Sequence, residues 1–539
     1  MKLSSEIYRI YKGLHTWAGI ISSLFLFICF YAGALTVFET PMNQWATPPS
    51  QLHTHTIPIE KIPEVTAKLS QQNPDFSRHF YLYLPQKDHP TYQLVWQVKD
   101  KDADEHNNAD SRFYTASQSA DGDMIIQQIF PSRINEFIDV LHRVAGLPSD
   151  TDINRWIIGV IVTLYALALL SGLIILLPTL IKDLFALRLN GQSKRVWLDA
   201  HNIVGIGSLP FHFVIAMTSF VFIYHDLIYG TQNQLIHEGK LRQALMSGMS
   251  KPVPNQPTDP IKMVSPEKII SAAKKLSPTF EPYMLEYTAL TTPAASVRIW
   301  GHDDYAIEPR PPGGFIPMNP YIGEAQTTAY LPGRQDAAST LLASFFAMHM
   351  ATYGGSPLRW IYFFLGLAGA WLFFTGNLLW IESRRNRQRR GQDVSVQRKD
   401  VSVMTAMTIG VSFGAINGIS LMLASSKWLS QWVTNPYPAY QVVYYFVFFL
   451  CIFWSLFRGQ GKSLTELLYL TTFTYLCIPF TSLLGYLFPV LGLWTHTTPT
   501  ALAVDATALM LSLVFLYVAR ITHKKTMQVE MQDSVWIRN

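Results

Sequence analysis

Leu14-His15-Thr16-Trp17-Ala18-Gly19 begins a long apolar run near the start of the chain, and Ala200-His201-Asn202-Ile203-Val204-Gly205 begins another. Both segments read His-x-x-x-Gly, so on a helix the glycine lies one turn from the histidine on the same face. Two further apolar runs follow Leu141-His142-Arg143 and Met348-His349. The order of apolar run, polar segment and apolar run therefore occurs twice, which indicates an internal repeat.

The composition indicates a membrane protein. The chain has 539 residues, of which 49% are hydrophobic and only 15% are charged, and its formal net charge is +5. Soluble proteins carry about a quarter charged residues, so a soluble enzyme is excluded. About eight runs of roughly 20 residues are apolar enough to cross a membrane as helices. The predicted spans are 14–38, 155–178, 197–225, 357–381, 401–425, 438–457, 464–488 and 499–520.

The basic residues predict how the spans are oriented. Lysines and arginines cluster in short loops, and these loops alternate with two long polar segments, 39–150 and 226–350. Because such clusters stay on the cytoplasmic side, we expect both termini in the cytoplasm and both polar segments on the other side. This topological role also explains the arginine-rich run after Trp380, so no nucleic-acid partner is expected. The three cysteines lie in apolar runs, and no disulfide framework is predicted.

Each long polar segment predicts a small α+β domain. In both, an amphipathic helical pattern precedes two runs of alternating polar and apolar residues, which are typical of strands with one buried face. The helices are expected at 59–69 and 266–276, and the strands at 81–84, 92–98, 283–287 and 296–300. The internal repeat therefore includes the polar segments.

The repeat places four histidines in two pairs. Parallel repeats are related by an axis along the membrane normal. His15 is therefore expected opposite His201 near the cytoplasmic side, and His142 opposite His349 near the outer side. Ionisable groups in a membrane are functional candidates by default, and two imidazoles on opposite sides of one iron suit a b-type haem. We therefore predict two haem b groups with these histidines as axial ligands, although a histidine on its own would more often cap a helix.

Nearby residues complete the predicted haem sites. Gly19 and Gly205 have no side chains, which leaves room for a flat macrocycle beside the histidines. The haem propionates are expected to pair with basic residues, namely Lys12 and Arg195 on the inner side and Arg155 and Arg359 on the outer side. The roles of two more histidines stay open. His212 could ligate the outer haem, form a third site or only hydrogen-bond, and His225 could contact substrate or haem.

Further motifs surround the histidines in a fixed order. They are Ala32-Gly33-Ala34-Leu35, Ser171-Gly172-Leu173 and Thr375-Gly376-Asn377-Leu378-Leu379-Trp380-Ile381-Glu382. Over about residues 5–385, this order resembles that of the PepSY-associated transmembrane proteins, which include iron-regulated inner-membrane proteins and siderophore-iron reductases of Gram-negative bacteria. The resemblance implies two PepSY-type periplasmic domains, haem ligation by the four histidines, and haem-dependent reduction of ferric siderophores that releases Fe(II). The four C-terminal spans depart from the four-helix core of that family.

The electron donor is expected to be a separate molecule. No G-x-G-x-x-G follows a predicted strand and begins a helix, so a separate reductase or membrane quinol must supply the electrons. A ferric siderophore or another periplasmic ferric chelate would accept them, because hard oxygen ligands hold Fe(II) less strongly than Fe(III). Membrane lipid is the remaining partner. Two other functions stay open: a siderophore, metal or solute transporter, and a non-enzymatic peptide-binding or regulatory membrane protein.

The predicted fold is a multi-pass α-helical membrane protein with about 8 transmembrane helices. A four-helix haem-binding core of two parallel repeats is joined by four extra C-terminal helices and two small periplasmic α+β domains. The predicted boundaries are 1–40 for the first span, 41–150 for the first domain with its interfacial helix, 151–182 for the second span, 183–225 for a cytoplasmic loop and the third span, 226–350 for the second domain with its interfacial helix, 351–385 for the fourth span, 386–400 for a basic linker, 401–525 for the C-terminal four-span domain and 526–539 for a cytoplasmic tail.

Overall fold

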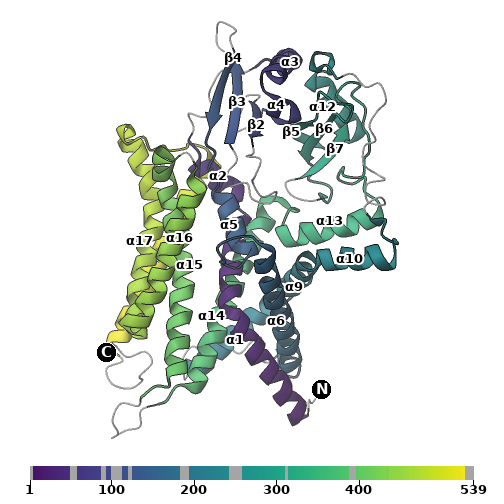
Figure 1. Ribbon diagram of the computed structural model, residues 1–539. Coiled ribbons are helices and arrows are strands. Elements are labelled where there is room, and N and C mark those ends of the chain that lie inside the picture. Colours follow the sequence, from purple (N-terminus) through teal and green to yellow (C-terminus); the bar gives the residue numbers. More distant parts are fainter. Residues whose placement is uncertain are drawn as a thin grey trace. The chain divides into compact units, whose positions relative to one another are not determined.

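The computed structural model describes most of the chain, and the described residues are 4–48, 57–85, 93–98, 112–118, 124–181, 193–241, 258–309, 313–387, 396–433 and 435–528. Most of the predicted cytoplasmic loop before the third span, of the basic linker and of the tail lies outside these residues. The chain divides into two compact units (Figure 1). We call them the helical unit (Met1–Thr47, Ser132–Ile223 and Trp360–Asn539) and the sheet unit (Pro48–Pro131 and Tyr224–Arg359).

The helical unit contains the long apolar helices. In the described part of the chain, seven helices are long and apolar enough to cross a membrane, and a bent pair of helices would make an eighth span. The first half of the unit has α1 (Ser5–Thr36), α6 (Asp152–Leu176), α8 (Ser193–Gly207), α9 (Leu209–Ile223) and α14 (Gly355–Arg384). Two short helices, α2 (Glu39–Ala46) and α5 (Ile134–Arg143), follow α1 and precede α6.

The predicted third span, 197–225, is not one straight helix. It is divided into α8 and α9, which meet at an angle of 68°. The break lies at Ser208, two residues before Pro210. Proline has no N–H to donate, and its ring collides with the carbonyl group four residues earlier, so a helix bends or breaks there.

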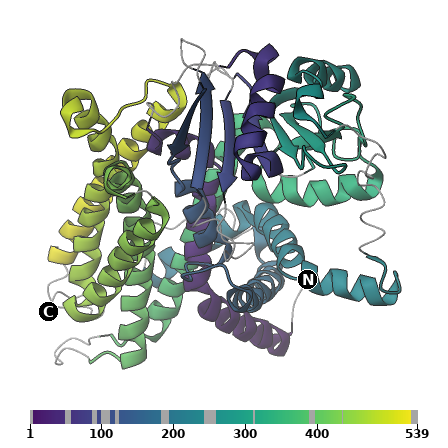
Figure 2. The same ribbon diagram turned by 45° about the horizontal axis from the view of Figure 1, so that its top comes forward.

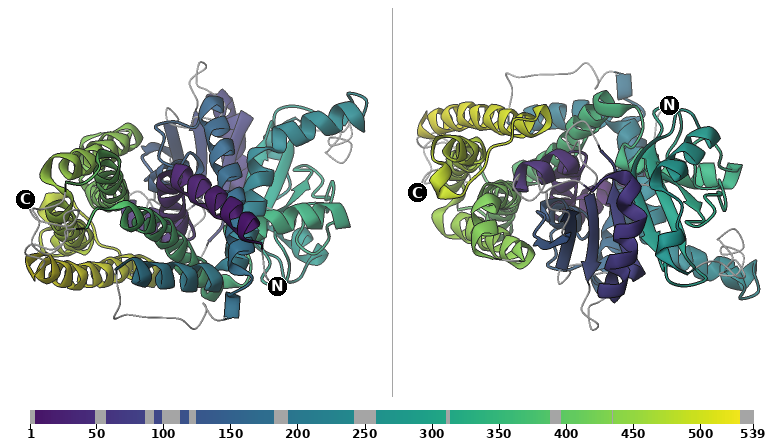
Figure 3. Two further views of the ribbon diagram at one scale, coloured as in Figure 1. Left: turned by 90° about the horizontal axis from the view of Figure 1, so that it is seen from below. Right: turned by 90° about the horizontal axis from the view of Figure 1, so that it is seen from above.

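The C-terminal helices form the second half of the helical unit. They are α15 (Lys399–Trp432), α16 (Pro436–Arg458), α17 (Gln460–Leu487) and α18 (Pro499–Gln528), with a short 3-10 helix, η4 (Pro489–Leu491), before α18. Figure 3 shows them grouped together, coloured green to yellow. Gly410 and Gly414 allow close contact between α15 and α16, since an added Cβ would lie 2.7 Å from Ile452 Cα and 2.8 Å from the carbonyl oxygen of Phe448. Small residues four apart are a common way to pack membrane helices.

In the described part of the sheet unit, seven strands form one antiparallel sheet in the order β4-β3-β2-β1-β5-β6-β7. The first four strands come from the first polar segment: β1 (His79–Tyr83), β2 (Gln93–Val98), β3 (Arg112–Gln118) and β4 (Met124–Ile129). The other three come from the second: β5 (Glu281–Thr288), β6 (Ser296–His302) and β7 (Gly314–Met318). The two halves join where β1 pairs with β5, with Phe80 opposite Tyr287 and Leu82 opposite Leu285.

Helices from both polar segments cover the same face of this sheet (Figure 2). They are α3 (Ile62–Gln72), α4 (Pro74–Arg78) and α12 (Pro266–Leu276), and the 3-10 helices η2 (Ile59–Lys61) and η3 (Pro260–Lys262) precede α3 and α12. Leu69 of α3, Phe80 of β1 and Ile269 of α12 are fully buried in one shared core. Two more helices, α10 (His225–Leu235) and α13 (Ala337–Met350), belong to the second segment.

The structure confirms the predicted helices and strands of the polar segments and adds β3, β4 and β7. It differs from the sequence prediction in one important respect. The two small domains that the repeat predicts share one sheet and one core, and so form a single unit. The reason is that each half would leave the edge of β1 or β5 unpaired, and pairing the two edges satisfies their backbone groups.

Candidate functional site

The structure brings together the two histidines that the sequence predicts at the cytoplasmic side. His15 lies on α1 and His201 on α8, and the centroids of their rings are 6.3 Å apart with the ring planes at 75°. Aromatic rings in edge-to-face contact have similar spacings. The same spacing also suits a shared metal, because two imidazoles held about 2 Å from one metal on opposite sides have centroids roughly 6 Å apart.

Hydrogen bonds fix the orientation of both rings through the same nitrogen. His15 Nδ1 lies 2.8 Å from the carbonyl oxygen of Ala168 on α6. His201 Nδ1 lies 3.1 Å from Thr375 Oγ1 on α14, and that hydroxyl itself donates to the carbonyl oxygen of Leu372. Both Nδ1 atoms therefore act as N–H donors, which leaves the lone pair on Nε2. Histidines that ligate a metal are usually held in this way.

A glycine of a neighbouring helix lies close to each of the two rings. A Cβ added to Gly172 on α6 would lie 2.9 Å from the Nδ1 and Cε1 atoms of His15, and one added to Gly376 on α14 would lie 3.5 Å from His201 Cε1. The sequence-based proposal concerned Gly19 and Gly205 instead. Among the described residues, an added Cβ at Gly19 would meet nothing within 4 Å, so open space remains beside the His15 helix, whereas one at Gly205 would contact Leu372 Cδ1 at 3.5 Å. The residues present thus fit a flat group held between two imidazoles.

His142 is held in the same manner on α5. Its Nδ1 atom lies 2.8 Å from the carbonyl oxygen of Cys29 on α1. A Cβ added to Gly33 would approach this Nδ1 to 2.7 Å. His349, its predicted partner, lies half-buried on α13 of the sheet unit. The pairing of His142 with His349 stays a prediction.

Comparison with known proteins adds the family. The model of the family described as PepSY-associated TM region matches residues 13–383. The chain belongs to this family. As a PepSY-associated TM protein whose described residues include seven or eight apolar helices long enough to cross a membrane, it is a multi-pass membrane protein. The matched part includes all four predicted ligand histidines and ends before α15. No curated protein matches the chain.

His212 of this PepSY-associated TM protein has a different environment. It lies on α9, is only 1% exposed, and is packed among aromatic rings that include Phe30 and Phe373. Its Nδ1 lies 2.7 Å from Tyr165 Oη, and the tyrosine hydroxyl also donates to the His212 carbonyl oxygen at 3.1 Å. Within the described residues, its Nε2 is buried with no hydrogen-bond partner. When the two repeats are aligned so that His15 matches His201, the residue that matches His212 is Leu26. The first repeat therefore supplies no second imidazole at this position.

The basic residues predicted to bind propionates are in different situations. Lys12 and Arg195 are exposed on α1 and α8, and Arg359 is exposed near the start of α14. Arg155, in contrast, is bound to Asp150, with 2.8 Å between Nε and Oδ1. The propionate roles stay predictions, and for Arg155 the carboxylate of Asp150 is a competing partner.

Asp150 is held by two arginines, since Arg143 binds it as well. Burial alone would raise the pKa of Asp150, but the hydrogen bonds and charges of Arg155 and Arg143 hold this pKa below its ordinary value. At neutral pH the carboxylate is therefore charged and keeps both guanidinium groups in place.

His225 is the other histidine whose role the sequence leaves open. It is exposed, and its Nε2 lies 3.2 Å from Asp226 Oδ1.

The C-terminal helices contain a buried polar cluster that the sequence pattern does not predict. Lys427 of α15 is 0% exposed and donates to Ser482 Oγ at 2.9 Å and to the Trp494 carbonyl oxygen at 3.1 Å. Its ammonium group lies 3.8 Å from the ring centroid of Trp45 on α2. Asp505 of α18 accepts hydrogen bonds from Ser482 Oγ at 3.1 Å and from Trp45 Nε1 at 2.9 Å. The sequence feature that could have revealed this cluster is Lys427 itself, which lies just beyond the end of the predicted fifth span at residue 425.

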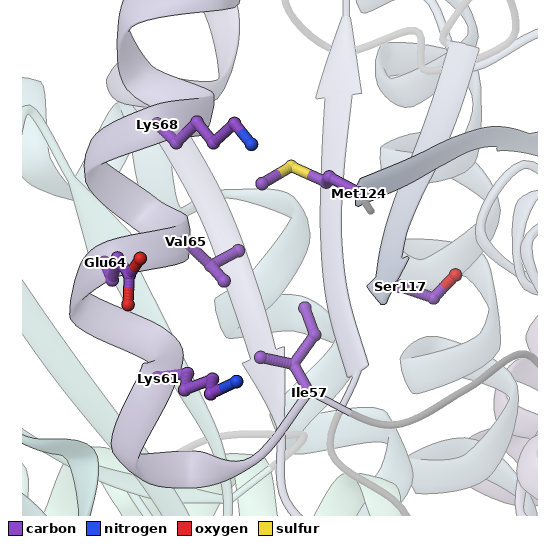
Figure 4. A pocket seen from close by; sticks show the side chains of 7 residues that line it. All are labelled: Ile57, Lys61, Glu64, Val65, Lys68, Ser117 and Met124. Atoms are coloured by element: carbon purple, nitrogen blue, oxygen red, sulfur yellow. The ribbon is translucent and has the colours of Figure 1, made fainter. Parts of the chain in front are cut away.

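Other candidate sites offer less. Among the described residues, no group of three or more histidine, cysteine or acidic side chains is arranged to hold a metal ion. A small pocket of about 90 Å³ lies between α3 and the strands β3 and β4. Figure 4 shows the residues that line it: Ile57, Lys61, Glu64, Val65, Lys68, Ser117 and Met124.

Proposed function

We propose that the protein is a haem-dependent transmembrane reductase of ferric chelates. It passes electrons from a separate reductase or a membrane quinol on the cytoplasmic side to a ferric siderophore, or another ferric chelate, on the periplasmic side. The observation that carries this proposal is the facing pair of His15 and His201, with each Nδ1 engaged and each ring against a glycine. Both histidines lie within residues 13–383, the part of the chain that the family model matches.

The chain's own residues would hold two haem b groups. His15 and His201 would ligate one of them, and His142 and His349 the other. When bound, haem supplies a one-electron Fe(III)/Fe(II) couple. The carbonyl oxygens of Ala168 and Cys29 fix the rings of His15 and His142, so these imidazoles are oriented before the cofactor binds.

The proposed orientation follows from charge. The short basic loops would lie in the cytoplasm, with both termini, and the sheet unit would lie in the periplasm of a bacterial inner membrane. The sheet unit supports this location because its apolar residues are collected in a core between helices and sheet, as in a water-soluble domain.

The reaction balances as a one-electron reduction of each ferric ion. A quinol donor would give up two electrons and two protons, and thus reduce two ferric ions. The product Fe(II) binds hard oxygen ligands less strongly than Fe(III) does, so the reduced iron would dissociate from the siderophore. The siderophore itself would not be chemically altered and could bind Fe(III) again.

The decisive experiment is spectroscopic. The full-length protein is purified in detergent, its haem is quantified by pyridine extraction, and the dithionite-reduced form is mixed with a ferric hydroxamate or catecholate without oxygen. We expect about two haems per chain and reoxidation of the haem by the chelate, with Fe(II) captured by ferrozine. A protein that has no Soret band would overturn the proposal and favour a transporter or a peptide-binding module.

A further inference from the structure

One face of α16 has an unusual composition for a membrane helix. Tyr437, Tyr440, Gln441, Tyr444 and Tyr445 follow the spacing of a single helical face. Tyr437, Tyr440 and Tyr444 are buried. The opposite face has exposed apolar residues, of which Val442 and Phe446 are 69% and 68% exposed. The apolar face is the one suited to lipid, and the polar aromatic face is turned into the protein.

The polar aromatic face of α16 packs on α5, the short helix that holds His142. Phe137 of α5 is 2% exposed, and its ring centroid lies 5.9 Å from that of Tyr437 and 5.6 Å from that of Tyr444. Arg133, just before α5, places its guanidinium group 4.9 Å from the Tyr437 ring centroid. Aromatic and cation–π contacts of this kind hold a helix in one position and orientation.

The same face of α16 also binds the turn that follows His142. Tyr445 Oη donates to the carbonyl oxygen of Leu147 at 2.9 Å and to that of Gly146 at 3.3 Å. Gln441, one helical turn earlier, donates from Nε2 to the carbonyl oxygen of Pro148 at 3.1 Å. Two neighbouring side chains thus satisfy three successive carbonyl groups.

That turn needs support because its backbone is unusual. Ala145 has φ +47° and Gly146 has φ +82°, so a residue with a side chain adopts the left-handed conformation only three positions after His142. Such conformations persist only where the surroundings enforce them. The turn also closes the end of α5, because the Gly146 N–H donates to the carbonyl oxygen of Leu141 at 3.0 Å. The hydrogen bonds from α16 therefore act on the helix end that positions His142.

The C-terminal helices hold α2 in a comparable way. Trp45 of α2 contacts Lys427 and Asp505 through the cluster described above, and Trp494 Nε1 donates to the carbonyl oxygen of Trp45 at 3.2 Å. The Tyr31 hydroxyl of α1 lies 2.6 Å from that of Tyr475 on α17. The helices α15–α18 thus contact the chain both where it leaves α1 and where it approaches α6.

From these contacts we infer that the C-terminal four-helix domain, α15–α18, is a part of the outer haem site. Tyr445 and Gln441 are positioning residues that set the orientation of His142 through the turn at 144–148. This inference rests on the proposed function, since it concerns a haem held by His142. It gives the C-terminal domain a role in tuning the potential of that haem, because the orientation of an axial ligand is one way in which a protein adjusts it.

The test compares Tyr445→Phe with Tyr517→Phe in the full-length haem-loaded protein. Tyr445→Phe removes one hydroxyl group and keeps the ring, and Tyr517 is 68% exposed on α18. Hydrogen–deuterium exchange follows the amides of Gly146 and Leu147, and redox titration with electron paramagnetic resonance follows each haem. For Tyr445→Phe we expect about 2- to 10-fold faster exchange of these amides, as for the loss of one hydrogen bond. We also expect a shifted midpoint potential and spectrum for one haem, while the other stays unchanged. Tyr517→Phe should match the wild type in all measurements.

Two results would overturn the inference while the proposed function stands. One is a haem-loaded Tyr445→Phe protein with wild-type exchange at 146–147. The other is faster exchange with both haem signals unchanged, which would show that the turn does not control His142. A purified wild-type protein without haem would instead overturn the proposed function, and the inference with it. A Gln441→Leu variant repeats the test at the neighbouring carbonyl of Pro148, in case the Tyr445 variant cannot be purified.

Discussion

Gly172 lies directly against the imidazole of His15, so closely that a Cβ on the glycine would come within 2.9 Å of two ring atoms. Gly376 lies beside His201 with a wider gap, since an added Cβ would lie 3.5 Å from Cε1 of that ring. A side chain at Gly172 would therefore displace the His15 ring, whereas the space at Gly376 accepts a Cβ. The glycines that matter most for the paired imidazoles lie on the helices opposite them, α6 and α14.

Gly172→Val is expected to remove about one haem per chain. The valine methyl groups would occupy the position of the His15 ring and break its hydrogen bond to Ala168. Pyridine extraction of the purified variant measures the loss. Gly13→Val is the matched control, since an added Cβ there meets nothing within 4 Å among the described residues. Equal haem content in both variants would contradict a role for this contact.

His15→Ala and His142→Ala are each expected to lower the haem content by about one per chain, and to leave different spectra behind. The reason is that the two histidines belong to different predicted pairs. His302→Ala serves as the control because this histidine is exposed on β6 of the sheet unit. If His142→Ala retained all of its haem while His212→Ala lost some, the assignment of the outer ligand would pass to His212.

Gly410→Leu is expected to destabilise the helical unit by about 1–3 kcal/mol, as other overpacked interiors are. An added Cβ at Gly410 would already lie 2.7 Å from the backbone of α16 at Ile452. Thermal unfolding in detergent measures the effect. Ala506→Leu adds a similar volume on an exposed face of α18 and should leave the unfolding temperature unchanged.

Lys427→Met is expected to cost about 1–3 kcal/mol, because it removes the hydrogen-bond donor to the Trp494 carbonyl oxygen and to Ser482 Oγ. Asp505 keeps its hydrogen bonds from Ser482 and Trp45, but Ser482 no longer links it to a cation. Lys427→Met combined with Asp505→Asn should cost less than the sum of the two single changes, because the members of one network are coupled. Additive effects in a double-mutant cycle on thermal unfolding would show that the two groups are independent.

Acid should weaken the sheet unit through Glu286. Burial alone would raise the pKa of this carboxyl, but hydrogen bonds from His79 and Trp300 and the charge of Arg298 hold the pKa below its ordinary value of 4.5. Its stabilisation is therefore complete above about pH 4.5 and is lost as the pH falls through the lower folded-state pKa. Glu286→Gln should flatten this acid limb of a stability–pH curve. Glu281→Gln, at an exposed position of the same strand, should leave it unchanged.

The sequence predicts the pairing of His15 with His201 because both motifs repeat with the same local pattern. It also predicts the helices and the first strands of each polar segment, since these follow from amphipathic periodicity. The contacts of Gly172 and Gly376 were not predicted, because the glycine one turn from a histidine was the only neighbour that spacing alone could identify. Which glycine of another helix faces a ring depends on how the helices pack.

The remaining differences between the sequence prediction and the structure come from contacts between residues that are far apart in the chain. Nothing local in β1 indicates that its free edge pairs with β5 rather than remaining in a separate domain. The bend before His212 has a local signal in Pro210, but the angle between α8 and α9 does not follow from the residue type. Lys427 escaped notice because a lysine close to the end of an apolar run normally extends to the membrane surface.

The central pairing of β1 with β5 has a consequence for synthesis of the protein. The ribosome produces β1 long before β5, and α6, α8 and α9 are made between them. In the interval β1 is an open strand edge, which is the kind of surface that recruits other strands and chaperones. Correct insertion of α6 and the α8–α9 pair therefore decides whether β5 is delivered to the same compartment as β1. A chain that inserts these helices wrongly would expose a half-sheet, and cellular proteases could recognise it and remove the misassembled protein.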